Sequence, residues 1–132
     1  MGYTRYWYRT EKPITQAFVD GVKEIIRDCT EKGITIRDWD GQDEPEITLD
    51  VVSFNGNADT GLEHESFVID NNPDEVGEFN FCKTARKPYD YAVKKALELA
   101  EQEGLVYDVS DDGDNPEGYS DEDYLNNKVD WY

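Results

Sequence analysis

The sequence predicts an α+β fold, a two-layer sandwich in which two helices cover one face of an antiparallel sheet. Two apolar stripes recur at helical spacing, one near 15–31 and one near 89–103. Short strand-like segments lie before, between and after these stripes. The middle segments are joined by short loops, which favours antiparallel pairing, and a ferredoxin-like connection is one arrangement that fits this order.

The first expected element is a strand at Tyr3–Arg9, because this segment is rich in aromatic residues and contains no glycine or proline. Pro13 and Thr15 then begin a helix. Its apolar positions share one helical face: Phe18, Val22, Ile25, Ile26 and Cys29. Gly33 is a natural end for this helix.

Four short strands are expected in the middle of the chain, at 34–37, 47–54, 65–69 and 79–82. Residues 38–46 form a loop between the first two of them. In the 47–54 strand, Ile47, Leu49 and Val51 alternate onto one face. The dipeptide Asn55-Gly56 that follows is typical of a tight turn.

The second helix is expected to begin near Pro88, because proline suits the first helical position. Its apolar stripe is continuous: Tyr89, Ala92, Val93, Ala96, Leu97 and Ala100. Gly104 ends this helix, and a last strand follows at 105–109. The length of 132 residues suits one domain, which we place at 1–110, followed by an acidic tail at 111–132 in which 120–129 is a candidate short helix.

The composition is strongly acidic. Lysine and arginine total 13 against 31 aspartates and glutamates, which gives a net charge of −18, and segment 38–82 holds thirteen acidic residues and no lysine or arginine. Such a chain is repelled by bulk duplex DNA and by anionic membranes. No segment approaches the roughly 20 apolar residues of a membrane span, and two cysteines build no disulfide framework, so we expect a cytoplasmic protein.

A first candidate surface lies on the N-terminal strand, where alternation places Tyr3, Arg5, Trp7 and Arg9 on one face. An aromatic ring between two guanidiniums can stack on a base and pair with phosphate, which points to a nucleotide-like anion. The alternative is a structural role, in which the arginine stems cover Trp7 and nearby carboxylates pair with the guanidiniums.

A second candidate surface is the segment FCKTARKPYD at 81–90, which precedes and opens the second helix. Four of its side chains are candidate ligand-binding residues: Lys83, Thr84, Arg86 and Lys87. Cations at a helix N-terminus oppose the helix dipole, and a bound phosphate or carboxylate would remove that conflict. The alternative is that these cations pair with Asp90 in the first helical turn or with the acidic residues of 38–82.

Other chemical signals are weak. His64 and Cys82 are the minimum for a thiol nucleophile, but without a catalytic signature we expect a strand-entry histidine, a core thiol and no enzymatic activity. Residues 108–114 partly fit a calcium loop, yet Tyr119 stands where the glutamate ligand belongs. The acidic stretch 38–41 is first of all a turn, so neither a metal nor a cofactor is expected.

Three stretches carry a resemblance to known sequences: MGYTRYW at 1–7, HESF at 64–67 and FCKTARKPYD at 81–90. They resemble a family of small uncharacterised proteins of phages, prophages and bacteria. The resemblance spans most of 1–105 and leaves out the acidic tail. It assigns no activity, but it implies a context, because small acidic phage proteins are often counter-defence factors.

Two functions fit this sequence. In the first, a phage-type counter-defence protein sequesters an anionic, nucleotide-like small molecule in a pocket of seven residues: Arg5, Trp7, Arg9, Lys83, Thr84, Arg86 and Lys87. In the second, spaced carboxylates mimic the phosphates of nucleic acid, and the chain inhibits a host defence protein by occupying its basic nucleic-acid-binding surface. Either function would be carried out in the cytoplasm of the host cell.

Overall fold

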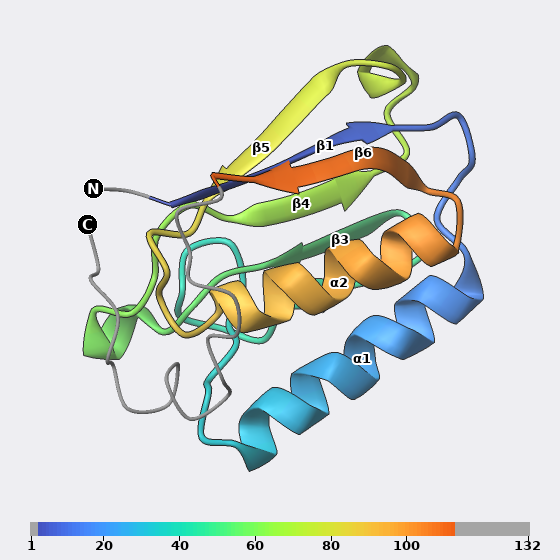
Figure 1. Ribbon diagram of the computed structural model, residues 1–132. Coiled ribbons are helices and arrows are strands. Elements are labelled where there is room, and N and C mark those ends of the chain that lie inside the picture. Colours follow the sequence, from blue (N-terminus) through green and yellow to red (C-terminus); the bar gives the residue numbers. More distant parts are fainter. Residues whose placement is uncertain (1–2, 113–132) are drawn as a thin grey trace.

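The computed structural model of the chain describes residues 3–112 (Figure 1). The strands are β1 (Thr4–Arg9), β2 (Glu46–Ile47), β3 (Val51–Phe54), β4 (Phe67–Asp70), β5 (Phe79–Lys83) and β6 (Val106–Asp111), and the helices are α1 (Gln16–Glu31) and α2 (Asp90–Gln102). Two short 3-10 helices lie at Ala58–Thr60 and Pro73–Glu75. The predicted α+β class is confirmed.

The strands form two three-stranded antiparallel sheets, with orders β5-β1-β6 and β2-β3-β4. We expected one sheet, and this expectation is wrong because β1 pairs only with β5 and β6, whereas β3 pairs only with β2 and β4. Figure 1 shows α1 and α2 side by side on one side of the strands. Both helices therefore cover the same side, as predicted.

The helix boundaries follow from local chemistry. The Thr15 hydroxyl caps α1 by accepting a hydrogen bond from the Phe18 backbone N–H at 3.1 Å. The predicted helix at 89–103 is confirmed, but it begins at Asp90 rather than at Pro88. Asp90 is therefore in the first helical turn, where the dipole favours negative charge. Neither helix among the described residues is long and apolar enough to cross a membrane.

The single strand expected at 47–54 is instead a hairpin formed by β2 and β3. The Thr48 N–H donates to the Val51 carbonyl at 2.9 Å, and the Thr48 hydroxyl accepts from the N–H groups of Asp50 and Val51. Threonine side chains that bond nearby backbone groups compete with an extended strand, and here they close a turn. Leu49 consequently lies at the exposed turn rather than on an inward face.

Two further local expectations are corrected. Residues 34–37 do not form a strand, because their backbone pairing consists of one isolated antiparallel bridge between Arg37 and Asn55. Asn55-Gly56 does not form the expected tight turn, since the Asn55 amide donates to the His64 carbonyl and its oxygen accepts from the His64 N–H, both at 3.0 Å. The side chain of Asn55 thus organises the long β3–β4 connection.

The core lies between the sheets and the helices and is centred on aromatic rings. Trp7 on β1 packs against Phe67 on β4, with ring centroids 5.3 Å apart, and Phe67 packs against Phe54 at 5.0 Å. These contacts join the two sheets across the core. The boundary predicted at residue 110 falls inside β6, because this strand extends to Asp111. Residues 113–132 of the predicted tail, with the candidate helix at 120–129, lie outside the described residues.

Candidate functional site

The four residues singled out on β1 do share one face, and that face is turned inward. Tyr3, Arg5, Trp7 and Arg9 are all buried. The Arg9 guanidinium donates to the backbone carbonyls of Leu105 at 2.6 Å and Asp70 at 2.9 Å. Trp7 is part of the core. The open pocket that we expected from Arg5, Trp7 and Arg9 is not formed, because these side chains already contact protein groups.

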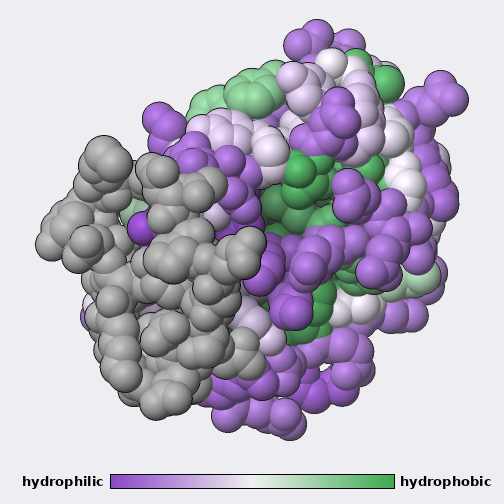
Figure 2. Space-filling view, in the orientation of Figure 1, coloured by the Kyte–Doolittle hydropathy of each residue, from purple (hydrophilic) through white to green (hydrophobic). Residues whose placement is uncertain are grey.

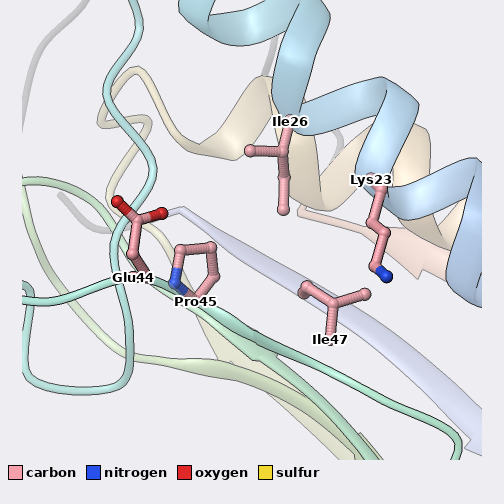
Figure 3. Close-up of a pocket in the computed structure, with 5 residues that line it drawn as sticks. All are labelled: Lys23, Ile26, Glu44, Pro45 and Ile47. Atoms are coloured by element: carbon pink, nitrogen blue, oxygen red, sulfur yellow. The ribbon is translucent and has the colours of Figure 1, made fainter.

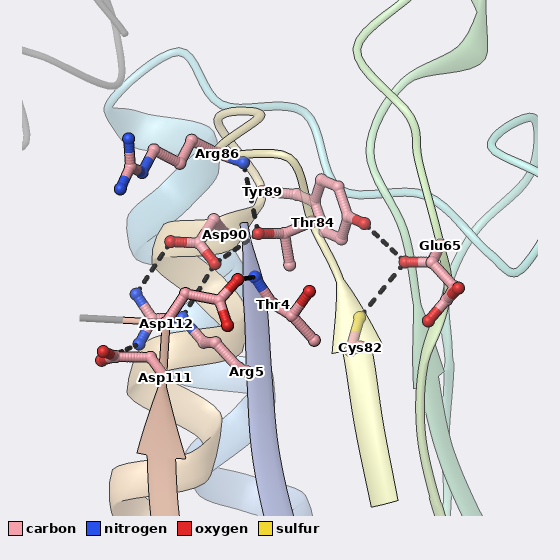
Figure 4. Close-up of polar contacts among 10 residues, drawn as sticks. All are labelled: Thr4, Arg5, Glu65, Cys82, Thr84, Arg86, Tyr89, Asp90, Asp111 and Asp112. Carbon is pink, nitrogen blue, oxygen red and sulfur yellow. Dashed lines mark hydrogen bonds and ion pairs between the residues drawn. The ribbon is translucent and has the colours of Figure 1, made fainter. Parts of the chain in front are cut away.

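Arg5 is held by a buried carboxylate from a distant part of the chain (Figure 4). Its Nε and one terminal nitrogen each donate to an oxygen of Asp90 at 2.8 Å, and the exposed fractions of the two side chains are 7% and 0%. The Thr84 hydroxyl donates to the same carboxylate at 2.7 Å. Asp111 adds a weaker contact with Arg5 at 3.4 Å. This network ties β1, the β5–α2 connection and β6 together.

The basic residues before α2 belong to the same region but are not gathered into one pocket. Arg86 stacks on Tyr3, with its guanidinium carbon 4.5 Å from the ring centroid. Lys83 lies over a different ring, on the opposite face of the sheet, 5.7 Å from the Phe81 centroid. Thr84 is fully buried, and Lys87 is half-buried with its backbone N–H donating to the Thr84 carbonyl. The carboxylate expected to resolve the conflict at the helix N-terminus is present within the chain, in Asp90.

His64 and Cys82 each contact a backbone carbonyl. The His64 Nδ1 lies 2.6 Å from the Lys83 oxygen, and the Cys82 thiol donates to the Glu65 oxygen at 3.3 Å. Burial raises the pKa of the Cys82 thiol, so this sulfur is held in the neutral form. A neutral, buried thiol is a poor nucleophile.

The acidic loop after α1 gathers three carboxylates. Atoms of Asp38, Asp40 and Asp43 lie within 4.8 Å of one another, and the Asp38 side chain accepts the backbone N–H groups of Gln42 and Asp43 at 3.2 Å. A hydrogen bond with Asp40 lowers the pKa of Asp38, and the same bond raises the pKa of Asp40. The side chain of Trp39, between the first two aspartates, is 68% exposed. This arrangement is the turn that the sequence predicts.

Several pockets open between the described residues. Figure 3 shows one of them, about 230 Å³ in volume, between α1 and the segment that enters β2. It is lined by Lys23, Ile26, Glu44, Pro45 and Ile47. A smaller one, about 140 Å³, includes Arg9 but none of the other predicted ligand-binding residues.

A cluster of three exposed and two half-buried rings was not singled out by the sequence analysis. It lies on the outer face of the β5-β1-β6 sheet, and we call it the aromatic face: Tyr6, Tyr8, Phe79, Phe81 and Tyr107. Phe79, Phe81 and Tyr107 are 52%, 47% and 42% exposed. Figure 2 shows hydrophobic surface along the upper edge of the molecule, over β5. The alternation of aromatic residues in β1 and in FNF at 79–81 is the signal that could have revealed it.

The rings of the aromatic face contact one another. Phe79 is central, with centroids 5.5 Å from Tyr6, 5.7 Å from Tyr8 and 6.0 Å from Phe81. Tyr8 stacks on Tyr107 at 5.4 Å. Cross-strand aromatic pairs stabilise a sheet, but a continuous set of exposed rings is also typical of a binding surface.

Comparison of the chain with protein-family models, with curated proteins and with solved structures gives no match. The interpretation of the site therefore depends on the geometry of the described residues.

Proposed function

We propose that this chain is a protein-binding module that docks on a positively charged surface of another protein. The proposal is supported by the distribution of charge between the surface and the interior. None of the thirteen carboxylates of segment 38–82 is buried, whereas Arg5 and Arg9 are enclosed in the interior and hydrogen-bonded there. The described surface is consequently dominated by negative charge, which attracts a basic partner from a distance.

The same geometry favours this function over capture of a nucleotide-like anion. In the expected pocket, Arg5, Trp7 and Arg9 supply the stacking surface and two of the cations, beside Lys83, Arg86 and Lys87. Arg5 is bound in a bidentate manner by Asp90, Arg9 donates to backbone carbonyls, and Trp7 packs on Phe67. A ligand would have to displace all of these contacts at a high desolvation cost.

In the context that the resemblance implies, the partner is a basic nucleic-acid-binding surface of a host defence protein, and the chain acts as its inhibitor. Negative charge would steer the encounter and raise the association rate. The carboxylates would then occupy positions that nucleic-acid phosphates otherwise take.

The test compares two variants with equal charge changes. In the first, four exposed carboxylates of the segment 38–82 are neutralised: Asp43→Asn, Glu44→Gln, Glu46→Gln and Asp50→Asn. In the control, four exposed carboxylates of the helices are neutralised: Asp20→Asn, Glu24→Gln, Glu98→Gln and Glu101→Gln. Partners are captured from a bacterial lysate over a range of salt concentrations and identified by mass spectrometry.

We expect basic nucleic-acid-binding proteins to be captured by the wild-type chain and by the control, and to be reduced with the first variant. Equal capture by all three chains would contradict a role for the cation-free segment. A thermal-shift screen against nucleotides and cyclic dinucleotides tests the other function. Strong, concentration-dependent stabilisation in that screen would favour nucleotide capture instead.

A further inference from the structure

The aromatic face offers exposed ring surface in addition to the ring contacts that stabilise the sheet. The opposite side of the same sheet faces the core through Trp7 and the other inward residues of β1, so the outer rings are not needed to fill the interior. Contiguous exposed aromatic residues are enriched in the central parts of interfaces. This face is therefore a candidate for the contact that follows electrostatic attraction.

Exposed carboxylates occur along the strands that carry the aromatic face. Glu78 directly precedes β5, Asp108 lies within β6, and both are exposed. The Tyr6 hydroxyl donates to the carboxylate of Asp112, which is exposed as well. The carboxylate at Tyr6 and the net charge of −18 make this face attractive to cations and repulsive to phosphates.

One cation of the chain itself already uses this surface. The Lys83 ammonium lies 5.7 Å from the centroid of Phe81, which is within the range of a cation–π contact. Arginine is better suited than lysine to such a surface. Its planar guanidinium can stack on a ring and form a bidentate hydrogen bond with a carboxylate at the same time.

We infer that the aromatic face binds an arginine-bearing segment of a basic protein, with guanidiniums stacked on the rings and paired with nearby carboxylates such as Asp112. This inference rests on the proposed function and names the contact surface for it. A second copy of the chain is a less suitable occupant, because each copy carries a net charge of −18. Single-stranded nucleic acid also stacks on aromatic sheet faces, but the net charge of −18 repels its phosphates.

The probes are two dye-labelled peptides of equal charge, nine arginines and nine lysines, titrated against the full chain at about 0.15 M salt, where surface charges are screened within ~8 Å. The test variant is Phe79→Leu with Phe81→Leu, which keeps apolar bulk on β5 but removes two ring faces. Its matched control is Val68→Ala with Leu49→Ala, which alters two exposed apolar side chains away from this face. Circular dichroism and thermal unfolding verify that all chains are folded.

We expect the arginine peptide to bind the wild-type chain more tightly than the lysine peptide. Removal of the two rings should weaken arginine binding by about fivefold, mainly through faster dissociation, and should weaken lysine binding less. The control should leave both affinities unchanged. Should the leucine variant not fold, Tyr107→Leu provides the same comparison from β6.

The failures are distinguishable. If neither peptide binds the wild-type chain, the proposed function itself is contradicted. If both peptides bind equally and ring removal changes neither affinity, a basic partner is still supported, but the aromatic face is not its contact surface. Tighter binding of an unlabelled oligothymidine to the wild-type chain than to the leucine variant would also overturn the inference, as would concentration-dependent self-association that ring removal abolishes.

Discussion

Removal of the Asp90 carboxylate should cause a large loss of stability, because this group compensates a buried guanidinium. The Asp90→Asn variant keeps the size of the side chain but loses the negative charge. Two 2.8 Å bonds with Arg5 and one 2.7 Å bond with Thr84 converge on this carboxylate, which is fully buried. Breaking one partner of a buried ion pair costs about 3–5 kcal/mol, since the remaining charge is left uncompensated.

This loss is large relative to the about 5–15 kcal/mol that keeps a typical domain folded. In urea, with a slope of about 1–3 kcal/mol per molar, the unfolding midpoint should fall by roughly 2 M. The assay is urea unfolding followed by circular dichroism and by tryptophan fluorescence. Both signals should give the same midpoint in a two-state transition.

Two controls separate the ion pair from other effects. Asp111→Asn removes the weaker partner of Arg5, at 3.4 Å and 39% side-chain exposure, so a change of no more than about 1 kcal/mol is expected. The double variant Arg5→Met with Asp90→Leu removes both buried charges and should be more stable than Asp90→Asn. An Asp90→Asn variant within about 1 kcal/mol of the wild-type chain would show that the Asp90 charge does not compensate Arg5.

Two further predictions concern the interior. Burial raises the pKa of the Cys82 thiol in the folded chain, whereas in the unfolded chain this thiol ionises near its ordinary pKa of 9.0. Ionisation therefore favours the unfolded chain, and the free energy of unfolding should fall as pH rises above about 9. Denaturant titrations from pH 7 to 10 should show this slope, and Cys82→Ala should reduce it; an unchanged slope would contradict the assignment. Gly56→Ala should destabilise by about 1–3 kcal/mol, because its Cβ would come within 2.0 Å of the Leu62 carbonyl oxygen. Gly61→Ala meets open space at a φ of +71° and should lose only about 1 kcal/mol in thermal unfolding; the opposite ranking would contradict the packing at Gly56.

Periodicity predicted the helices well because it reports on a local property. The apolar stripe of α1 and the capping residue Thr15 lie within one short stretch of the sequence, and the structure confirms both. Alternation likewise placed Arg5, Trp7 and Arg9 on one face of β1. It could not tell which face is buried, because Tyr6 and Tyr8 on the other side are equally aromatic.

The remaining differences arise from long-range contacts and from turns. The partner of Asp90 is Arg5, 85 positions earlier in the chain, and no local pattern marks such a pair. The hairpin at 46–54 depends on hydrogen bonds of the Thr48 hydroxyl with the backbone, and the strand-like alternation of this segment does not reveal them. The division into two sheets depends on which strands pair, and that choice also produces the aromatic face.

The most direct test of the proposed binding is a spectrum of the aromatic rings during titration with the arginine peptide. Carbon–proton resonances of phenylalanine and tyrosine are assigned in the full chain and followed by NMR. We expect the largest shifts at Phe79, Phe81 and Tyr107, while the buried rings of Phe54 and Phe67 are unchanged. Binding without any shift at the first three rings would rule out the aromatic face as the contact surface.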